Sequence, residues 1–257
     1  MPATYIQAAL LNEQGRAEIG VKGVKEKVIL CFSGGKDSVL ALYELLKHDD
    51  YEVAGLLTTI TQGYGRIAMH GVKANLLELQ TRALGMRLEK VMIPKNSSDE
   101  EYESRMRAVL ERYLASEIHT VAFGDIFLED IRKQRENNLS KMGMKAIFPL
   151  WKNNTAELAQ KFIKLGFKAV ITCIDGDIFD KTYAGKAFDK EFLFEIPCGT
   201  DPCGENGEFH SFVYDGPLFS ERISHTVGKV VLREKRFYYC DLTAVENCPG
   251  TIKQETN

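Results

Sequence analysis

The chain has 257 residues, of which 44% are hydrophobic and 27% are charged, and its formal net charge is −3. This composition is that of an ordinary soluble globular protein, and the length suits one large domain or a domain with a smaller lobe. The sequence has no basic stripe, which argues against a nucleic-acid partner, and no apolar run approaches the roughly 18 residues of a membrane span. Because no signal-peptide pattern is visible, we expect the protein in the cytoplasm.

From residue 27 onward, short apolar runs alternate with amphipathic stretches. The apolar runs predict strands at residues 28–32, 52–59, 87–93, 120–123, 145–148 and 169–173. The amphipathic stretches predict helices at residues 38–47, 71–84, 98–115, 128–141 and 155–165. This alternation predicts an α/β fold with a Rossmann-like (HUP-type), mostly parallel sheet and helices on both faces.

The alternation ends near residue 175, where segments shorten and Gly and Pro cluster. We therefore expect an N-terminal extension at 1–26, a ligand-binding α/β domain at 27–174 and a smaller C-terminal α+β substrate lobe at 175–257. In that lobe we expect strands at residues 229–232 and 236–240. The lobe would lie against the strand ends, and exposed apolar positions in it would permit a homodimer.

A Ser-Gly-Gly-Lys-Asp-Ser motif at residues 33–38 links the first strand to the first helix. The first amides of a helix have no internal partner and form an anion site together with the helix dipole, and glycines let phosphate approach the backbone. Lys36 adds a cation, and Asp37 fits if it caps the helix or holds Mg²⁺. The expected nucleotide contacts come from the whole motif: Ser33, Gly34, Gly35, Lys36, Asp37 and Ser38.

A second candidate loop follows the predicted strand at 52–59. Ligands of open α/β sheets bind beyond the carboxyl ends of the strands. Thr58 and the glycine-rich loop after it would therefore lie beside the nucleotide. His70 comes directly before a predicted helix, so it either reaches the base, ribose or substrate or is a solvated loop histidine.

A third candidate loop follows the predicted strand at 120–123. Asp125 stands at this strand end next to a glycine, where it is placed for catalysis by holding Mg²⁺ or a substrate amine. Asp130 and Arg132, in the helix that follows, are candidate substrate contacts. Arg132, Arg135 and Glu136 share one helical face, so pairing along the helix explains part of this charge equally well.

Residues 198–211 alternate glycines with carboxylates and contribute little to a core. We expect a loop that faces the Ser33 motif. Glu205 and Glu208 are candidate catalytic groups that would bind Mg²⁺, orient ammonia or take a proton from it. Asn206 and His210 are candidate substrate contacts, and the sequence does not rank these roles.

The Ser33 motif resembles the SGGxDS loop of the PP-loop ATP pyrophosphatase superfamily, whose members split ATP between the α and β phosphates. With Gly124-Asp125-Ile126, Pro149-Leu150-Trp151 and Cys-Gly-Glu-Asn-Gly-Glu-Phe at 203–209, the chain resembles the diphthine–ammonia ligase family from about residue 28 to 223. The resemblance implies that ATP and Mg²⁺ are used to join a carboxylate and ammonia into an amide through an acyl-adenylate.

The substrate implied by this resemblance depends on the branch of the family. Archaeal and eukaryotic members amidate diphthine on elongation factor 2, and their loop tends to read GEGGEFE or GEGGEYE. This chain has Asn206 for the middle glycine and His210 for the acidic residue, and its long loop at 63–70 is similar to a bacterial branch. Bacteria do not make diphthamide, so a bacterial member would act on a small molecule such as a cobalamin-related carboxylate.

Three other functions remain in competition. Transfer RNA thiolation needs a reactive cysteine pair and a basic face, and the six cysteines include no C-x-x-C. NAD or GMP synthesis is another PP-loop chemistry, and free ammonia would be the nitrogen source here. A non-catalytic nucleotide sensor would not need Glu205, Glu208 and His210 in one segment.

Overall fold

The computed structural model describes residues 24–67 and 71–245. Five strands form a parallel sheet in the order β4–β2–β1–β5–β6. Their bounds are β1 (Glu26–Cys31), β2 (Tyr51–Thr61), β4 (Leu88–Ile93), β5 (Thr120–Ala122) and β6 (Lys145–Ile147). A two-residue strand, β3 (Arg66–Ile67), adds antiparallel to the end of β2.

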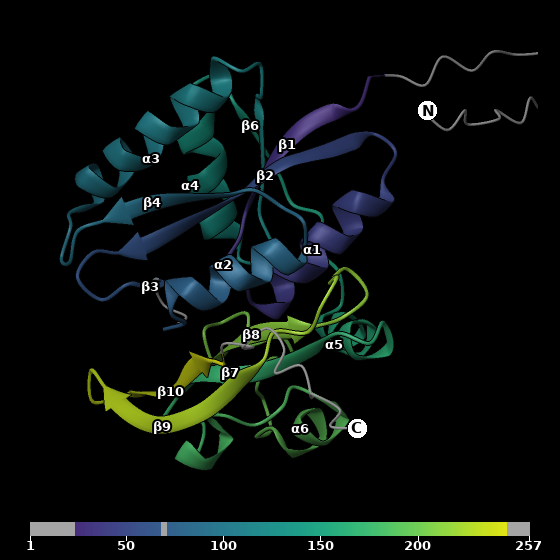
Figure 1. The fold of residues 1–257 in the computed structure, drawn as a ribbon, viewed down its shortest axis with the longest axis vertical. Helices are drawn as coiled ribbons and strands as arrows, with labels where there is room; N and C mark the ends of the chain where they lie inside the picture. Colours follow the sequence, from purple (N-terminus) through teal and green to yellow (C-terminus); the bar gives the residue numbers. More distant parts are fainter. Residues whose placement is uncertain (1–23, 68–70, 246–257) are drawn as a thin grey trace, which may run out of the picture.

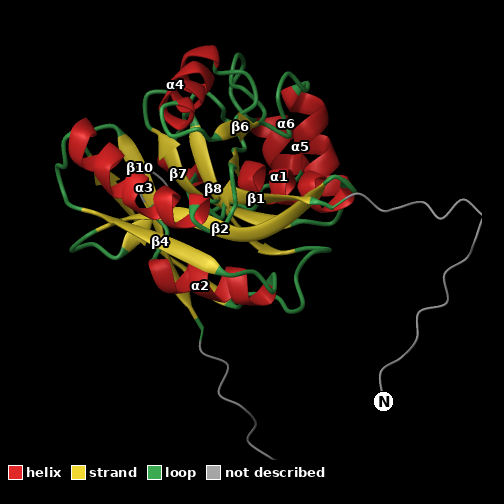
Figure 2. Ribbon diagram, turned by 90° about the horizontal axis from the view of Figure 1, so that it is seen from above, coloured by secondary structure: helices red, strands yellow, loops and turns green. Residues whose placement is uncertain are grey.

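Helices cover both faces of this sheet, as Figures 1 and 2 show. Helices α1 (Lys36–Lys47) and α2 (Ala74–Ala83) lie on one face, and α3 (Asp99–Leu114) and α4 (Glu129–Ser140) lie on the other. Side chains of β1 alternate between the two cores, because Val28 and Leu30 pack on the α1 side and Ile29 packs on the α3 side. The predicted α/β class is confirmed. The predicted start of a helix at Ser98 is also confirmed, because Ser98 Oγ accepts from the Glu101 amide.

The rest of the described chain forms a second, antiparallel sheet in the order β8–β7–β10–β9. Its elements, with the helices around them, are α5 (Thr155–Lys164), β7 (Lys168–Asp175), a 3₁₀ turn (Lys181–Tyr183), α6 (Lys190–Glu195), β8 (Phe209–Asp215), β9 (His225–Arg233) and β10 (Phe237–Ala244).

The predicted place of residues 169–173 in the parallel sheet is wrong, because β7 pairs only with β8 and β10 of the second sheet. Seven of the eight residues of β7 are buried. A strand covered on both faces is apolar throughout whether its neighbours are parallel or antiparallel, so its pattern could not separate the two cases. The strand β8 was not expected either, since its first residues follow a polar, glycine-rich loop.

The second sheet packs against the first domain through α1 and α2, which lie between the two sheets in Figure 1. One hydrophobic core runs through this interface and includes the fully buried rings of Phe162, Phe167 and Phe212. As a result, β8 passes directly beside the turn that precedes α1, where the Val213 amide donates to the Gly34 carbonyl at 3.0 Å.

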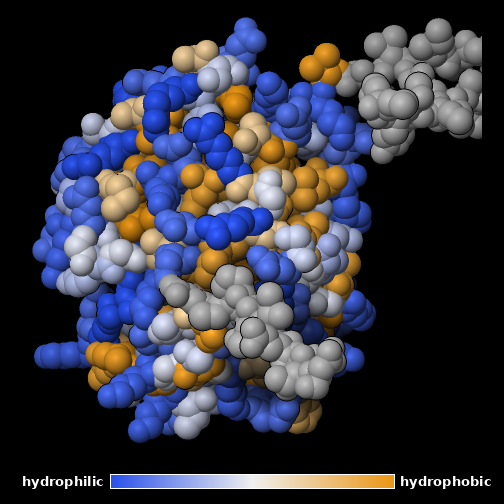
Figure 3. Space-filling model, viewed as in Figure 1, coloured by the Kyte–Doolittle hydropathy of each residue, from blue (hydrophilic) through white to orange (hydrophobic). Residues whose placement is uncertain are grey.

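Within the described ranges, no helix is both long and apolar enough to cross a bilayer. On the face drawn in Figure 3, hydrophilic side chains are spread over both sheets with hydrophobic ones between them.

The strand order positions the site. The chain passes from β1 outward to β2 and β4, then returns to the other side of β1 for β5 and β6. Loops at the carboxyl ends of β1 and β5 therefore diverge and leave a crevice, which is where doubly wound sheets bind ligands. The Ser33 motif and Asp125 follow these two strands.

Candidate functional site

The turn between β1 and α1 has the geometry of an anion site. Gly34 has a φ of +79°, a conformation that glycine adopts without strain. The Gly35 amide donates to Ser33 Oγ at 3.3 Å, and Ser38 Oγ donates to the Gly35 carbonyl at 2.9 Å. The Ser33 hydroxyl thus pairs with an amide that has no partner within the helix, whereas the Gly35 carbonyl also accepts from the Val39 amide at 3.0 Å.

Neighbouring elements hold this turn closely. A Cβ atom on Gly124 would lie 3.2 Å from the backbone of Asp37 and Ser38, so the loop after β5 packs directly on the start of α1. From α2, Gln80 Nε2 donates to the carbonyls of Gly34, at 2.9 Å, and Val213, at 2.6 Å. The turn is therefore tied to β5, α2 and β8 together.

Ser211 and Gln80 belong to the site and were not among the predicted residues. Ser211 Oγ, on β8, accepts from the Lys36 amide at 3.2 Å, and Ser211 lines the cavity beside the turn, which is the central cavity of the molecule's candidate site. Its place at the end of the glycine–carboxylate segment, 198–211, was a clue that could have identified it. Gln80 is fully buried in the middle of a helix, and nothing in its sequence surroundings indicates this role.

Lys36 is enclosed and does not extend freely into solvent. Its side chain is 4% exposed, and Nζ contacts Asp37 Oδ2 at 2.7 Å, the Cys203 carbonyl and the face of the Phe209 ring. Burial lowers its pKa, but the charges of Asp37 and Glu205 and the hydrogen bond to Asp37 outweigh this effect. The pKa thus lies above its ordinary value, and Lys36 remains an ammonium ion that joins the two loops.

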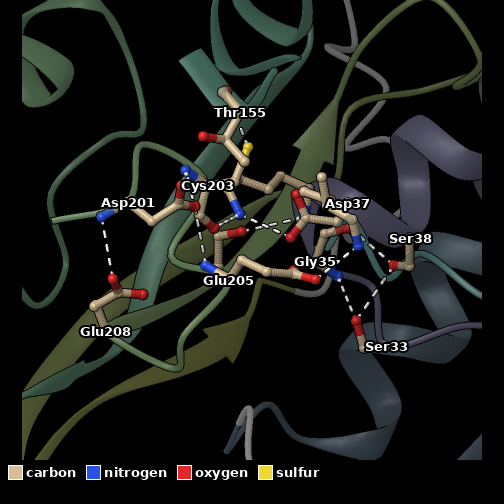
Figure 4. Close-up of polar contacts among 12 residues, drawn as sticks. Ser33, Gly35, Asp37, Ser38, Thr155, Asp201, Cys203, Glu205 and Glu208 are labelled. Carbon is tan, nitrogen blue, oxygen red and sulfur yellow. Dashed lines mark hydrogen bonds and ion pairs between the residues drawn. The ribbon is translucent and has the colours of Figure 1, made fainter. Parts of the chain in front are cut away.

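Glu205 comes from the loop before β8 and reaches toward the turn (Figure 4). Its Oε1 accepts from the Ile126 amide at 2.6 Å and the Phe127 amide at 3.3 Å. The pKa of Glu205 is raised to about 7, chiefly by burial and to a smaller extent by the charges of Asp37 and Asp125, while the two amide hydrogen bonds lower it in part. Glu205 therefore exchanges a proton near neutral pH.

Glu208 has different surroundings, although it lies only three residues further on. It is 5% exposed, it does not line the central cavity, and Figure 4 shows it on the side of the loop away from the turn. Its oxygens accept from the Asp201 amide, the Asn206 amide and Asn206 Nδ2 at 2.9–3.0 Å. Glu208 and the exposed Asn206 thus hold the loop in shape.

The two loops enclose a cavity of about 500 Å³. Most of the predicted residues line it: Ser33, Gly35, Lys36, Asp37, Ser38, Thr58, Asp125, Glu205 and His210. Burial, with a smaller contribution from the charge of Lys36, lowers the pKa of His210 to about 4, so this imidazole is neutral at physiological pH.

Other predicted residues do not reach the cavity. Asp130 is exposed in the first turn of α4. Arg132 pairs with Glu136 at 2.7 Å and lies over the Trp151 ring, so the pairing along the helix is the interpretation that its position supports. Arg135 lines the cavity in place of Arg132. His70 lies outside the described residues.

The cavity suits a magnesium ion that arrives with a polyphosphate. In residues 24–67 and 71–245, no group of three or more His, Cys, Asp or Glu side chains is arranged to hold a metal ion. However, Asp37, Asp125 and Glu205 line one cavity. The negative charges of Asp37 and Asp125 raise the pKa of Glu205, although burial raises it more. Mg²⁺ is usually bound by one or two carboxylates together with substrate phosphates and water, so these residues fit it.

Comparisons with known proteins give a consistent result. Residues 26–146 match the family description "Diphthamide synthase N-terminal domain", and residues 154–244 match "Diphthamide synthase C-terminal domain". The chain is 25% identical over 224 residues to diphthine–ammonia ligase of Schizosaccharomyces pombe, covering 80% of this chain and 37% of that protein. It is 24% identical over 227 residues to diphthine–ammonia ligase of Homo sapiens, covering 80% of this chain and 85% of that protein.

Among solved structures, the chain is similar to the U34-tRNA thiolase NcsA from Methanococcus maripaludis with its [4Fe-4S] cluster. The sequence identity is 17%, the match covers 58% of this chain and 60% of that one, and the TM-score is 0.36. A TM-score this low supports no conclusion about function.

Proposed function

The chain belongs to the diphthamide synthase family, and on that premise we propose that it is an ATP-dependent carbon–nitrogen ligase. The reaction joins ammonia to a carboxylate and releases AMP and pyrophosphate. One observation carries this proposal. The turn at Ser33, the Asp125 loop and the Glu205 loop, which are far apart in the sequence, line one cavity at the switch point of the sheet.

The first step is the transfer of adenylate to the carboxylate. A carboxylate oxygen attacks the α phosphorus, the bond to the bridging oxygen breaks, and pyrophosphate leaves with the bonding electrons. Negative charge then grows on the leaving group. The amides at the start of α1 and the ammonium group of Lys36 lie where they would stabilise that charge, and such preorganised electrostatics usually contributes more to catalysis than any other single effect.

Asp37 and Asp125 are the residues that would hold Mg²⁺ next to the phosphates. When bound, the ion would neutralise charge on the leaving pyrophosphate. Ser211 and Ser38 would orient their hydroxyls toward the phosphate oxygens, because both line the cavity beside the turn.

The second step forms the amide. Ammonia attacks the acyl carbon, AMP leaves, and the nitrogen loses a proton. Glu205 faces the cavity and has a pKa of about 7, which matches a group that accepts a proton at neutral pH. Glu208 would act indirectly, since its hydrogen bonds fix the loop that carries Glu205.

Two acyl substrates follow from the family. The relatives are named for diphthine, so diphthine on elongation factor 2 is the first candidate. A cobalamin-related carboxylate is the second, because Asn206 and His210 replace the residues that the diphthamide branch tends to have.

The proposal is tested by product analysis. Pure protein is incubated with ATP, Mg²⁺, ammonium and either diphthine-bearing elongation factor 2 or cobyrinic acid. We expect AMP and pyrophosphate in equal amounts with one of the two acids. When ammonium or the acid is left out, AMP should form much more slowly than in the complete mixture. Formation of ADP, or ATP binding without turnover in either arm, would contradict the ligase assignment, and binding alone would favour a nucleotide sensor.

A further inference from the structure

A second cavity, of about 250 Å³, lies between α3 and α4 on the face of the parallel sheet away from the second sheet. It adjoins the first cavity, because the same residues line part of both: Cys31, Tyr102, Met106, Phe123 and Arg135. The reaction proposed above leaves this space without a role.

The walls of the second cavity are amphipathic. Buried apolar side chains from β5, α3 and α4 form one part, among them Val121, Leu110 and Leu139. Exposed charged side chains of both signs form another, among them Asp99, Arg107 and Lys141. Such a lining accepts a short aliphatic body whose polar groups remain near water.

Arg135 stands at the junction of the two cavities and already holds a carboxylate there. Its Nε lies 2.9 Å from Asp125 Oδ2, its Nη2 donates to Asp125 Oδ1 at 3.1 Å, and its guanidinium lies 4.3 Å from the centre of the Phe123 ring. Only the contact between Nη2 and Oδ1 is a hydrogen bond, because Nε and Oδ2 are buried and have no hydrogen-bond partner. A guanidinium prefers to bind a carboxylate through two parallel bonds. The junction therefore holds the Asp125 carboxylate by an ion pair and leaves the Nε donor of Arg135 open to a better aligned carboxylate.

We propose that the second cavity binds the acyl part of the substrate and that Arg135 holds the substrate carboxylate in exchange for that of Asp125. This inference rests on the proposed ligase function. The exchange would place the substrate carboxylate at the junction of the second cavity and the first. There it would be within reach of the α phosphate of a nucleotide bound at the Ser33 turn. Arg135 is then a substrate-binding residue. The sequence alone could not distinguish Arg135 from Arg132 in this role.

The size of the cavity limits what enters it. A volume of 250 Å³ corresponds to the liquid volume of roughly eight water molecules. It therefore accommodates one modified side chain of a protein or one carboxylate-bearing arm of a small molecule. Both sources share the same chemistry, a carboxylate on a short aliphatic chain.

Steady-state kinetics test this assignment with two kinds of variant. Arg135→Gln removes the guanidinium, and Met142→Trp fills the second cavity from a half-buried position that does not line the first. Arg112→Gln is the matched control, because Arg112 is on α3, is 63% exposed and lines neither cavity. AMP formation is followed with diphthine-bearing elongation factor 2 in one arm and cobyrinic acid in the other.

We expect Arg135→Gln to raise KM for the active acid about 10–150-fold, which is the effect of losing hydrogen bonds to a charged group. KM for ATP should stay within about twofold of wild type, because the substitution removes a contact with the acid and leaves the nucleotide contacts in place. Met142→Trp should also raise KM for the acid, and Arg112→Gln should change neither constant. The arm in which wild type turns over identifies the source of the carboxylate.

Other outcomes overturn the inference. If Arg135→Gln raises KM for ATP as much as KM for the acid, Arg135 positions the nucleotide. If Met142→Trp raises only KM for ammonium, the cavity is a route for ammonia. If thermal denaturation shows that Met142→Trp is unfolded, Leu110→Phe is used to fill the same space. An unchanged KM for the acid in whichever variant is folded would exclude binding of the acid in the second cavity. If wild type makes no AMP in either arm, the ligase function itself fails.

Discussion

The close packing around Gly34 leads to a quantitative prediction about the Gly34→Ala substitution. Gly34 has a φ of +79°, and an added Cβ would lie 2.5 Å from Gln80 Oε1 and 2.7 Å from Leu77 Cδ1. The left-handed conformation costs an alanine about 1–2 kcal/mol. Crowding in a packed region costs about 1–3 kcal/mol more. We therefore expect the free energy of unfolding to fall by about 2–5 kcal/mol.

Gly199→Ala is the control that isolates the effect of crowding. Gly199 has a φ of +86°, and an added Cβ would have no neighbour within 4 Å. This variant carries the conformational cost alone, about 1–2 kcal/mol. The effect of alanine on the unfolded chain is the same at both sites and cancels in the comparison.

Urea denaturation of both variants measures the difference, and calorimetry with pyrophosphate measures the effect on binding. Gly34→Ala should lose pyrophosphate affinity, while Gly199→Ala should keep it. Adding Gln80→Ala to Gly34→Ala should recover part of the crowding cost, in the manner of a double-mutant cycle. Equal destabilisation by Gly34→Ala and Gly199→Ala would refute the close approach of α2 to the turn.

Substitutions at three further positions address the chemistry of the cavity. Ser211→Ala removes the hydroxyl beside the Lys36 amide and should weaken pyrophosphate binding about 2–13-fold, whereas Ser211→Thr keeps a hydroxyl and should not weaken it. Equal pyrophosphate affinity of wild type and both variants in calorimetry would exclude a contact between Ser211 and the phosphate. Because the carboxylate form of Glu205 is the active one, wild-type kcat at constant free ammonia should rise as pH increases through about 7. Glu205→Gln should lower kcat about 10²–10⁴-fold and abolish this rise, and a pH profile unchanged by the substitution would exclude Glu205 as the base. Lys36→Ala should lower the rate of AMP formation on the order of 10²–10³-fold, and near-normal turnover would count against charge stabilisation by this group.

The first part of the fold could be predicted because its elements have strong local patterns. Each apolar run that ends in a polar loop is followed by an amphipathic helix, and the caps are visible, as at Ser98. The turn at Ser33 was predictable for the same reason, since Gly34 and Gly35 stand between a strand and a helix. The second sheet was harder, because β7 is buried on both faces and β8 emerges from a glycine-rich loop.

The site could be predicted at the level of loops but not of individual side chains. Glu205 and Glu208 have similar local sequence, and only the path of the loop turns the first toward the cavity and the second into a network with Asn206. Arg132 and Arg135 are three residues apart on α4, and only the packing of that helix decides which one reaches the cavity. Their catalytic and binding roles stay predictions.

The central claim is that the Ser33 turn and the Glu205 loop bind one nucleotide between them. A crystal structure with α,β-methylene-ATP, in which the scissile bond cannot break, tests this most directly. We expect the two outer phosphates on the amides at the start of α1, near Ser211, with the α phosphate facing Glu205 and the Arg135 junction. A nucleotide bound elsewhere, or bound at the turn with its α phosphate directed away from Glu205, would contradict the account.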